Sequence, residues 1–470
     1  MAAQQDSTGG MSGSPLPAPT VMGAGASSAT APAPHLAELG LALSGGGSRA
    51  AAFHRGTLQG LMELGLLPGV EVVSTVSGGS IFAAAWMAAK ANAEQEERFL
   101  ANMKVELCKG FVLRSLNPLQ LAKLLLPRHT RTNVLAETFD RLFFRGLNLK
   151  QLPEHPRLCI NTTVLNHAQV GKFSREGFAT ADVFADDTHR RRTVPLPDFP
   201  LKLAATASAA FPIGLPPLFL SRKRDLGNAA FAERLHSHRT LALSDGGLLE
   251  NLGVQTLLKS RRFGAWNLII SDAGTQESTW TPGDLVDPVK AFLMVLFSAP
   301  HLVRISTLMN SKQNRSMREL TLRELEISWM ASRMREGSTE TPLDEGMRAF
   351  LADRHMRPRR KLLFLRVNQD LETLLTLLPR WRWCELWQAA HPGQRVPPTP
   401  KEPEALQERL ASLGVDLGKA VELYKTLGGR DRARQLNTIG THFQKLSPEE
   451  VDGLAQHARW QVHATRALFW

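Results

Sequence analysis

The sequence has few cysteines and no long apolar run, and both absences narrow the class of protein. Its 470 residues include only three cysteines, Cys108, Cys159 and Cys384, which lie far apart and form no CxxC pair. This usage argues against a disulfide framework or a zinc site and is compatible with a reducing compartment. The longest apolar candidate, residues 291–303, is short and interrupted by polar residues and a proline. We therefore expect no transmembrane helix.

Positive charge is absent from the start of the chain. No lysine or arginine precedes Arg49, so the basic residues of a secretory signal, a twin-arginine signal or a transit peptide are missing. Residues 1–36 consist mainly of small residues and proline, and we expect a disordered tail there. These features favour a cytoplasmic or peripheral membrane location, with non-classical export left open.

The rest of the chain is basic. The formal net charge is +12, and Lys and Arg cluster at 189–192, 222–224 and 354–361. Such clusters either are solvated surface or attract anionic membranes or nucleic acid. Because no zinc-finger, RNA-recognition or helix-turn-helix signature accompanies the charge, we expect no nucleic-acid partner and favour peripheral docking on an anionic membrane surface.

Two loops dominate the organisation of residues 39–93. The apolar run 39–44 predicts a strand, and the glycine-rich Ser44–Arg49 leads from it into a helix over 50–64. The valine-rich 70–76 predicts a second strand, which ends at Ser77, and a helix follows. This alternation indicates a parallel sheet with a right-handed crossover, whose ligands bind beyond the carboxyl ends of the strands. We therefore expect both loops to face one crevice.

The alternation continues to about residue 280. Further strands are expected at 157–165, 241–244 and 266–271. The sequence thus predicts an α/β fold. We divide the chain into a tail (1–36), a catalytic core (37–280), a mostly helical insertion or lid (281–424) and C-terminal helices packing on the core (425–470). A strand at 361–367 is expected to return to the sheet, and Ser447–Glu450 is typical of a helix start.

The two loops also carry the candidate chemistry. Ser77, on a sharp strand-to-helix turn, is a candidate nucleophile that needs a base. The N–H groups of Gly45, Gly46 and Gly47 could stabilise an oxyanion, and Arg49 could bind a substrate phosphate. The glycine loop also fits a loose dinucleotide fingerprint, but the acidic residue that should end the second strand is missing, so nucleotide binding receives little support.

Two kinds of residue compete for the role of base. No histidine follows a strand in a short Gly/Asp context, and His54 and His167 come closest. Asp245 is the better candidate, because it ends a strand, is followed by two glycines, and would gain basicity from partial burial. Asp272, at the next strand end, is the alternative carboxylate, although capping the following turn is its simpler role.

These motifs together resemble those of the patatin-like phospholipases. The resemblance rests on the glycine loop, the Ser77 turn, Ala207–Pro212, Asp245-Gly246-Gly247 and Asn251-Leu252-Gly253, in that order. It covers roughly 37–280 and, more weakly, the helices after 436. It implies a three-layer α/β/α sandwich with a mainly parallel sheet, a Ser77–Asp245 dyad, an oxyanion hole in the glycine loop, and hydrolysis of acyl esters of lipids. Gly79, Gly246 and Gly247 would support the site.

One position departs from the family pattern. The family usually has Gly-x-Ser-x-Gly around its nucleophile, and Thr75 occupies the first position here. A threonine adds bulk at the turn, which Gly78 could relieve.

The sequence therefore predicts a serine acyl hydrolase acting on phospholipids or lysophospholipids. Its expected partners are a lipid substrate and a membrane surface, with no cofactor or metal and with a protein activator left open. A Ser-His-Asp esterase and a catalytically inactive lipid-binding or scaffold protein are the alternatives. Acyl position and head-group preference stay open.

Overall fold

A computed structural model describes most of residues 37–274 and the C-terminal helices. The residues described are 37–111, 124, 129–166, 168–180, 194–196, 198–212, 215–221, 240–260, 263–274, 315–317, 319–332, 360–441 and 443–470. The predictions for the tail 1–36, for the basic clusters at 189–192 and 222–224, for His167, and for much of 281–359 lie outside these residues.

In the described part of the chain, nine strands form one mixed sheet. Its centre is parallel, in the order β3 (Arg157–Val164), β2 (Val72–Val76), β1 (Ala37–Leu43), β8 (Ala265–Asp272) and β9 (Leu362–Arg366). Antiparallel strands extend the β3 side: β4 (Gln169–Ser174), β5 (Gly177–Thr180), β6 (Leu218–Ser221) and β7 (Thr240–Asp245). The predicted strands are confirmed, whereas β4, β5 and β6 were not predicted.

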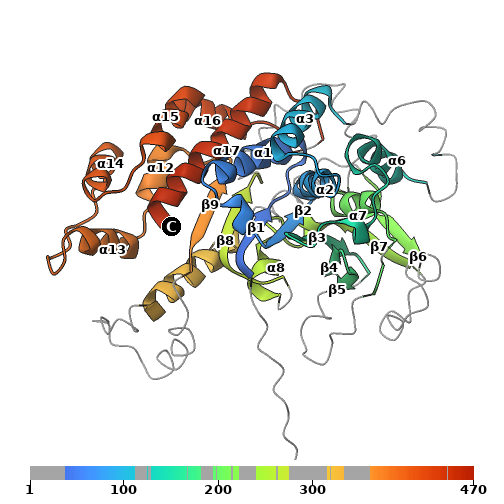
Figure 1. The fold of residues 1–470 in the computed structure, drawn as a ribbon, viewed down its shortest axis with the longest axis horizontal. Coiled ribbons are helices and arrows are strands. Elements are labelled where there is room, and N and C mark those ends of the chain that lie inside the picture. Colours follow the sequence, from blue (N-terminus) through green and yellow to red (C-terminus); the bar gives the residue numbers. More distant parts are fainter. Residues whose placement is uncertain are drawn as a thin grey trace, which may run out of the picture. The chain divides into compact units, whose positions relative to one another are not determined.

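Helices cover both faces of the sheet (Figure 1). Side chains alternate between the faces of a strand, so Leu41 and Ile269 join one core while Ala42 and Ile270 join another. The first face is covered chiefly by four helices: α1 (Gly47–Glu63), α2 (Gly78–Ala91), α3 (Glu96–Lys109) and α17 (Pro448–Phe469). The second face is covered by α8 (Val254–Lys259) and by the helical residues 319–332, whose Leu325 is buried there. The three-layer α/β/α architecture is therefore confirmed.

The remaining described α-helices lie before or after β3 in the sequence or belong to the C-terminal part. They are α6 (Arg131–Phe139), α7 (Leu201–Ser208), α12 (Leu371–Thr376), α13 (Arg380–Ala390), α14 (Pro403–Ser412), α15 (Gly418–Leu427) and α16 (Gly429–Asn437). A third apolar core, which includes Trp383, Leu410 and Trp460, joins α12–α15 to α17. None of the helices described is both long enough and apolar enough to cross a bilayer.

Helix α17 starts where the sequence predicts. Ser447 Oγ accepts a hydrogen bond from the Glu450 N–H at 3.2 Å, and Glu450 Oε2 accepts one from the Ser447 N–H at 2.7 Å. This reciprocal capping box satisfies two N–H groups at the helix start, and Pro448 has no N–H to satisfy.

The register of β3 positions the carboxyl ends of two other strands. Asn161 of β3 pairs with Val76, the last residue of the parallel strand β2. The next residue of β3, Thr162, pairs with Asp245, the last residue of the antiparallel strand β7. Because β2 and β7 run in opposite directions along β3, their carboxyl ends meet. Asp245 therefore arrives beside the residue that follows Val76, which is Ser77.

Helices α1 and α17 pack at a distance that only glycine permits. A Cβ added to Gly56 would lie 1.8 Å from the backbone oxygen of Ala455, and one added to Gly60 would lie 2.8 Å from Val462 Cβ. Real Cβ atoms cannot approach a backbone oxygen so closely, so α17 would have to shift. The C-terminal helix thus lies directly against the helix that begins in the glycine loop.

We expect Gly56→Ala to lower the free energy of unfolding by about 2–3 kcal/mol, because it overpacks the α1–α17 contact. Gly69→Ala is the matched control: its Cβ would have only one neighbour within 4 Å, a leucine methyl at 3.9 Å. Urea unfolding of both variants measures the difference. Equal midpoints for the two would contradict the close approach.

Candidate active site

Ser77 occupies a strained turn between β2 and α2. Its backbone angles are φ 50° and ψ −120°, a conformation that non-glycine residues rarely adopt. The two residues after it must be very small, since a Cβ on Gly78 would lie 2.5 Å from the Gly47 oxygen and one on Gly79 would lie 2.5 Å from the Leu43 oxygen. The turn therefore packs tightly against the end of β1 and the glycine loop.

Asp245 lies within hydrogen-bonding distance of Ser77. The Ser77 hydroxyl donates to Asp245 Oδ2 at 2.6 Å, and the Gly247 N–H donates to Oδ1 at 2.7 Å. Burial raises the pKa of Asp245 from its ordinary 3.8 to about 6, while these two hydrogen bonds oppose part of the rise. The carboxyl group is thus ionised at neutral pH yet more basic than an exposed aspartate, as a proton acceptor for serine requires.

The glycine loop lies beside Ser77. A Cβ on Gly45 would lie 3.0 Å from Ser77 Cβ. Gly46 and Gly47 have φ of 141° and 56°, and the first intrahelical hydrogen bond of α1 runs from the Ala50 N–H to the Gly46 oxygen at 3.1 Å. The N–H groups at this helix start precede that bond and are suited to bind negative charge.

Gly45 differs from its two neighbours in the loop. Its N–H already donates to the Asn251 backbone oxygen at 3.0 Å. The Asn251 side chain also fills the space beside the loop, since its Oδ1 lies 2.2 Å from where a Gly45 Cβ would be and 2.7 Å from where a Gly247 Cβ would be. Asn251 therefore buttresses both glycine segments. Sequence reasoning included it in the resemblance but assigned it no contact, because the contact forms only in the folded chain.

Arg49 does not have the role expected of it. Its side chain is fully buried, and its guanidinium donates to the Ala273 oxygen at 2.6 and 3.1 Å and to the oxygens of Asn437 and Ile439 at 3.2 and 2.9 Å. Backbone carbonyl groups therefore take the donors that a substrate phosphate would need. The expectation that Arg49 binds a phosphate is wrong. The residue instead ties the start of α1 to the residue that follows β8 and to the end of α16 and the chain just after it.

The alternative bases are engaged elsewhere. His54 is buried between Ser271 Oγ, 2.8 Å from Nδ1, and the Ser44 oxygen, 2.9 Å from Nε2, and burial lowers its pKa to about 4. Asp272 accepts the Gly274 N–H at 2.9 Å, as a turn cap does. Among the described histidines, none has a hydrogen bond to Ser77 or Asp245. The described residues also contain no group of three His, Cys, Asp or Glu side chains that could hold a metal.

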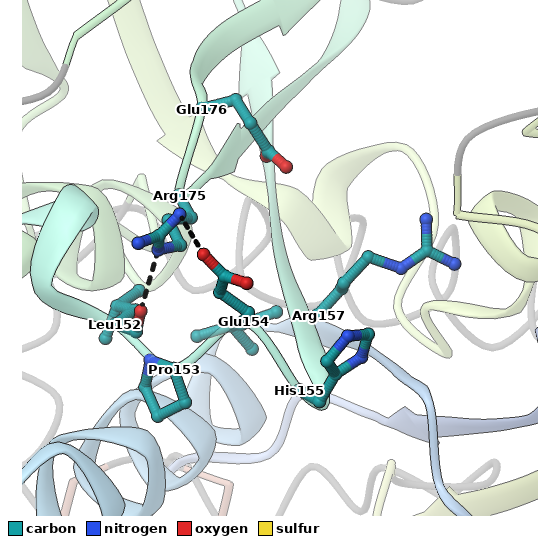
Figure 2. Close-up of a pocket in the computed structure, with 8 residues that line it drawn as sticks. Leu152, Pro153, Glu154, His155, Arg157, Arg175 and Glu176 are labelled. Carbon is teal, nitrogen blue, oxygen red and sulfur yellow. Dashed lines mark hydrogen bonds and ion pairs between the residues drawn. The ribbon is translucent and has the colours of Figure 1, made fainter.

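A cavity of about 270 Å³ lies at the amino end of β3, away from the strand residues that pair with β2 and β7 next to Ser77 and Asp245 (Figure 2). Arg175 and Glu154 form an ion pair of 3.1 Å at its wall, and Arg157, the first residue of β3, also lines it. Arg157 pairs with Val72 at the start of β2, whereas Ser77 follows the end of that strand. The length of β2 thus separates this cavity from Ser77.

Comparison with protein families gives residues 41–258 a match to the patatin-like phospholipase family. This stretch includes the glycine loop, Ser77 and Asp245. Residues 41–258 form a patatin-like phospholipase domain. No curated protein gives a significant sequence match to the chain.

Three solved structures are among those that match this chain. Human GIVD cytosolic phospholipase A2, in complex with methyl γ-linolenyl fluorophosphonate, matches with 14% identity and a TM-score of 0.41, over 92% of this chain and 59% of that one. VipD from Legionella pneumophila matches with 12% identity and a TM-score of 0.26, over 70% and 61%. ExoU from Pseudomonas aeruginosa, in complex with SpcU, matches with 16% identity and a TM-score of 0.24, over 90% and 77%. The chain thus spans less than two thirds of the human enzyme's length.

We expect Arg49→Met to lower the free energy of unfolding by more than about 3 kcal/mol, because three carbonyl groups lose a charged donor in the interior. The ratio of activity on a phospholipid to activity on an uncharged acyl ester should not change. Arg98→Met is the control, since that side chain is 79% exposed. A normal unfolding midpoint combined with selective loss of phospholipid hydrolysis would restore the phosphate-binding role.

Proposed function

We propose that the protein is a serine acyl hydrolase that cleaves ester-linked fatty acids from phospholipids or lysophospholipids through a Ser77–Asp245 dyad. The observation that carries this proposal is the 2.6 Å hydrogen bond from the Ser77 hydroxyl to the buried Asp245 carboxylate. The patatin-like domain supports a lipid acyl hydrolase in general. The proposal adds the Ser77–Asp245 dyad and the phospholipid or lysophospholipid substrate class to this general activity.

In the proposed mechanism Asp245 accepts the Ser77 proton as Oγ attacks the acyl carbonyl carbon. The carbonyl oxygen becomes an oxyanion, which the N–H groups of Gly46 and Gly47 stabilise; each such donor is typically worth about 2.7–4 kcal/mol. The tetrahedral intermediate then expels the alcohol, which takes the proton from Asp245, and leaves an acyl-enzyme. A water molecule, deprotonated by Asp245, then attacks the acyl carbonyl carbon. The C–Oγ bond breaks, Ser77 Oγ takes the proton back from Asp245, and the fatty acid is released.

The proposal assigns two further features of the chain to lipid chemistry. The net charge of +12 favours docking on an anionic membrane surface, where a lipid hydrolase meets its substrate. The division into a core at 37–280, a helical lid region at 281–424 and C-terminal helices at 425–470 is part of the same proposal. A protein activator and a cytoplasmic or peripheral membrane location are compatible with it.

Ser77→Ala and Asp245→Asn should each abolish hydrolysis across a panel of phospholipids, lysophospholipids and triacylglycerols. Wild-type protein should form a covalent adduct at Ser77 with a fluorophosphonate, because the activated hydroxyl attacks the phosphorus. Ser412→Ala and Asp416→Asn, which change exposed positions in and after α14, should behave as wild type. Lipid binding without any adduct would favour the scaffold alternative, and hydrolysis that survives both substitutions would overturn the site.

The acid limb of the reaction should lie near pH 6. Only the carboxylate form of Asp245 accepts a proton, and burial raises its pKa to about 6. The rate of fluorophosphonate labelling should therefore be constant above that pH and fall about tenfold per unit below it. Labelling rates from pH 4 to 8 test this. A midpoint near 4, the ordinary value for an aspartate, would contradict a buried base.

A further inference from the structure

The end of α7 contacts the backbone of both Ser77 and Asp245. We propose that Ser208–Ala210 acts as a clamp that sets the distance between these two residues, with the Ser208 hydroxyl as its positioning group. The inference rests on the proposed function, because it concerns the geometry of the same dyad. Ser208 itself reaches no substrate atom in this proposal.

The Ser208 hydroxyl is used to its full capacity. It donates to the Asn161 backbone oxygen, and it accepts from the Ser77 N–H at 3.0 Å and from Ser80 Oγ at 2.8 Å. A hydroxyl offers one proton and two lone pairs, so all three are occupied. Asn161 is the β3 residue that pairs with the last residue of β2. Ser208 thus joins the nucleophile turn to the strand that aligns it with Asp245.

These assignments determine which of the neighbouring hydroxyl groups donates in each hydrogen bond. Because the Ser208 proton goes to Asn161, Ser80 must donate to Ser208, which leaves Ser80 to accept from Thr75 Oγ1 at 2.9 Å. Thr75 has a single hydroxyl proton, so the Cys159 oxygen, 3.2 Å from Thr75 Oγ1, competes with Ser80 as its acceptor. Thr75, Ser80 and Ser208 are fully buried. The threonine that departs from the family motif is therefore the far end of the chain of hydroxyls that reaches the Ser77 N–H.

The other end of the clamp contacts β7. The Ala210 backbone oxygen accepts from the Asp245 N–H at 3.0 Å and from Ser244 Oγ at 2.8 Å. Ser208, the last residue of α7, therefore accepts a hydrogen bond from the Ser77 N–H, and Ala210, just after the helix, accepts one from the Asp245 N–H. The strained Ser77 backbone needs such support, since a turn with positive φ persists only where surrounding contacts determine it.

The test compares Ser208→Ala with Thr206→Val. Thr206 is a buried threonine in the same helix whose hydroxyl has no hydrogen-bond partner among the described residues, so its loss removes no bond. Ser208→Ala should lower kcat and the labelling rate of Ser77 by about 10- to 100-fold with KM nearly unchanged, because the reacting groups move apart while binding is kept. Hydrogen exchange of the Ser77 amide should accelerate at least tenfold. Thr206→Val should match wild type in all of these.

A second pair of variants, at Thr75, tests the clamp if Ser208→Ala does not fold. Thr75→Val removes the far hydroxyl at nearly constant volume and should slow labelling several-fold, and Thr75→Ser, which keeps the hydroxyl, should restore it. Wild-type labelling and wild-type exchange of the Ser77 amide in Ser208→Ala, or in Thr75→Val, would overturn the clamp. Failure of wild-type Ser77 to label would overturn the proposed function instead, and the exchange comparison would still decide the clamp.

Discussion

The pairing of β3 with two strands that meet end to end is the constraint on which the site depends. Asn161 and Thr162, adjacent in β3, pair with the last residues of β2 and β7. The distance between their partners is therefore fixed by one residue step of a strand, about 3.3 Å. This register brings Ser77 to a residue 168 positions away in the sequence. A slip of one residue would turn the Asp245 side chain to the other face of the sheet.

Close packing where β2 and β7 meet explains why glycines are required there and also why the pKa of Asp245 is raised. Gly78 and Gly79 let the Ser77 turn touch the glycine loop and the end of β1 with no side chain between them. The same exclusion of solvent leaves Asp245 only 3% exposed. Burial destabilises its charge and so raises its pKa. The close packing that Gly78 and Gly79 permit thus also makes the Asp245 carboxylate a stronger base.

Sequence reasoning found the local features of this arrangement and missed the distant ones. The turn at Ser77 and the Asp-Gly-Gly after a strand are visible because each motif is contiguous. Short apolar and β-branched runs, together with helical spacing, revealed the α/β alternation. The direction of β7 was not visible, since strand direction depends on which neighbour a strand pairs with. Arg49 was misassigned for a similar reason: its carbonyl partners lie 224, 388 and 390 residues further along the chain.

Thr75 shows how a departure from a motif is accommodated physically. A buried hydroxyl without a partner costs roughly 1–3 kcal/mol, so a threonine in place of glycine requires compensation. Ser80 supplies it by accepting the Thr75 proton, with the Cys159 carbonyl as a competing acceptor, and Ser80 in turn donates to Ser208. The substitution therefore extends a hydrogen-bonded chain rather than leaving a polar group unsatisfied. Because that chain ends at the Ser77 amide, Thr75 belongs to the hydrogen-bonded network that supports the Ser77 turn.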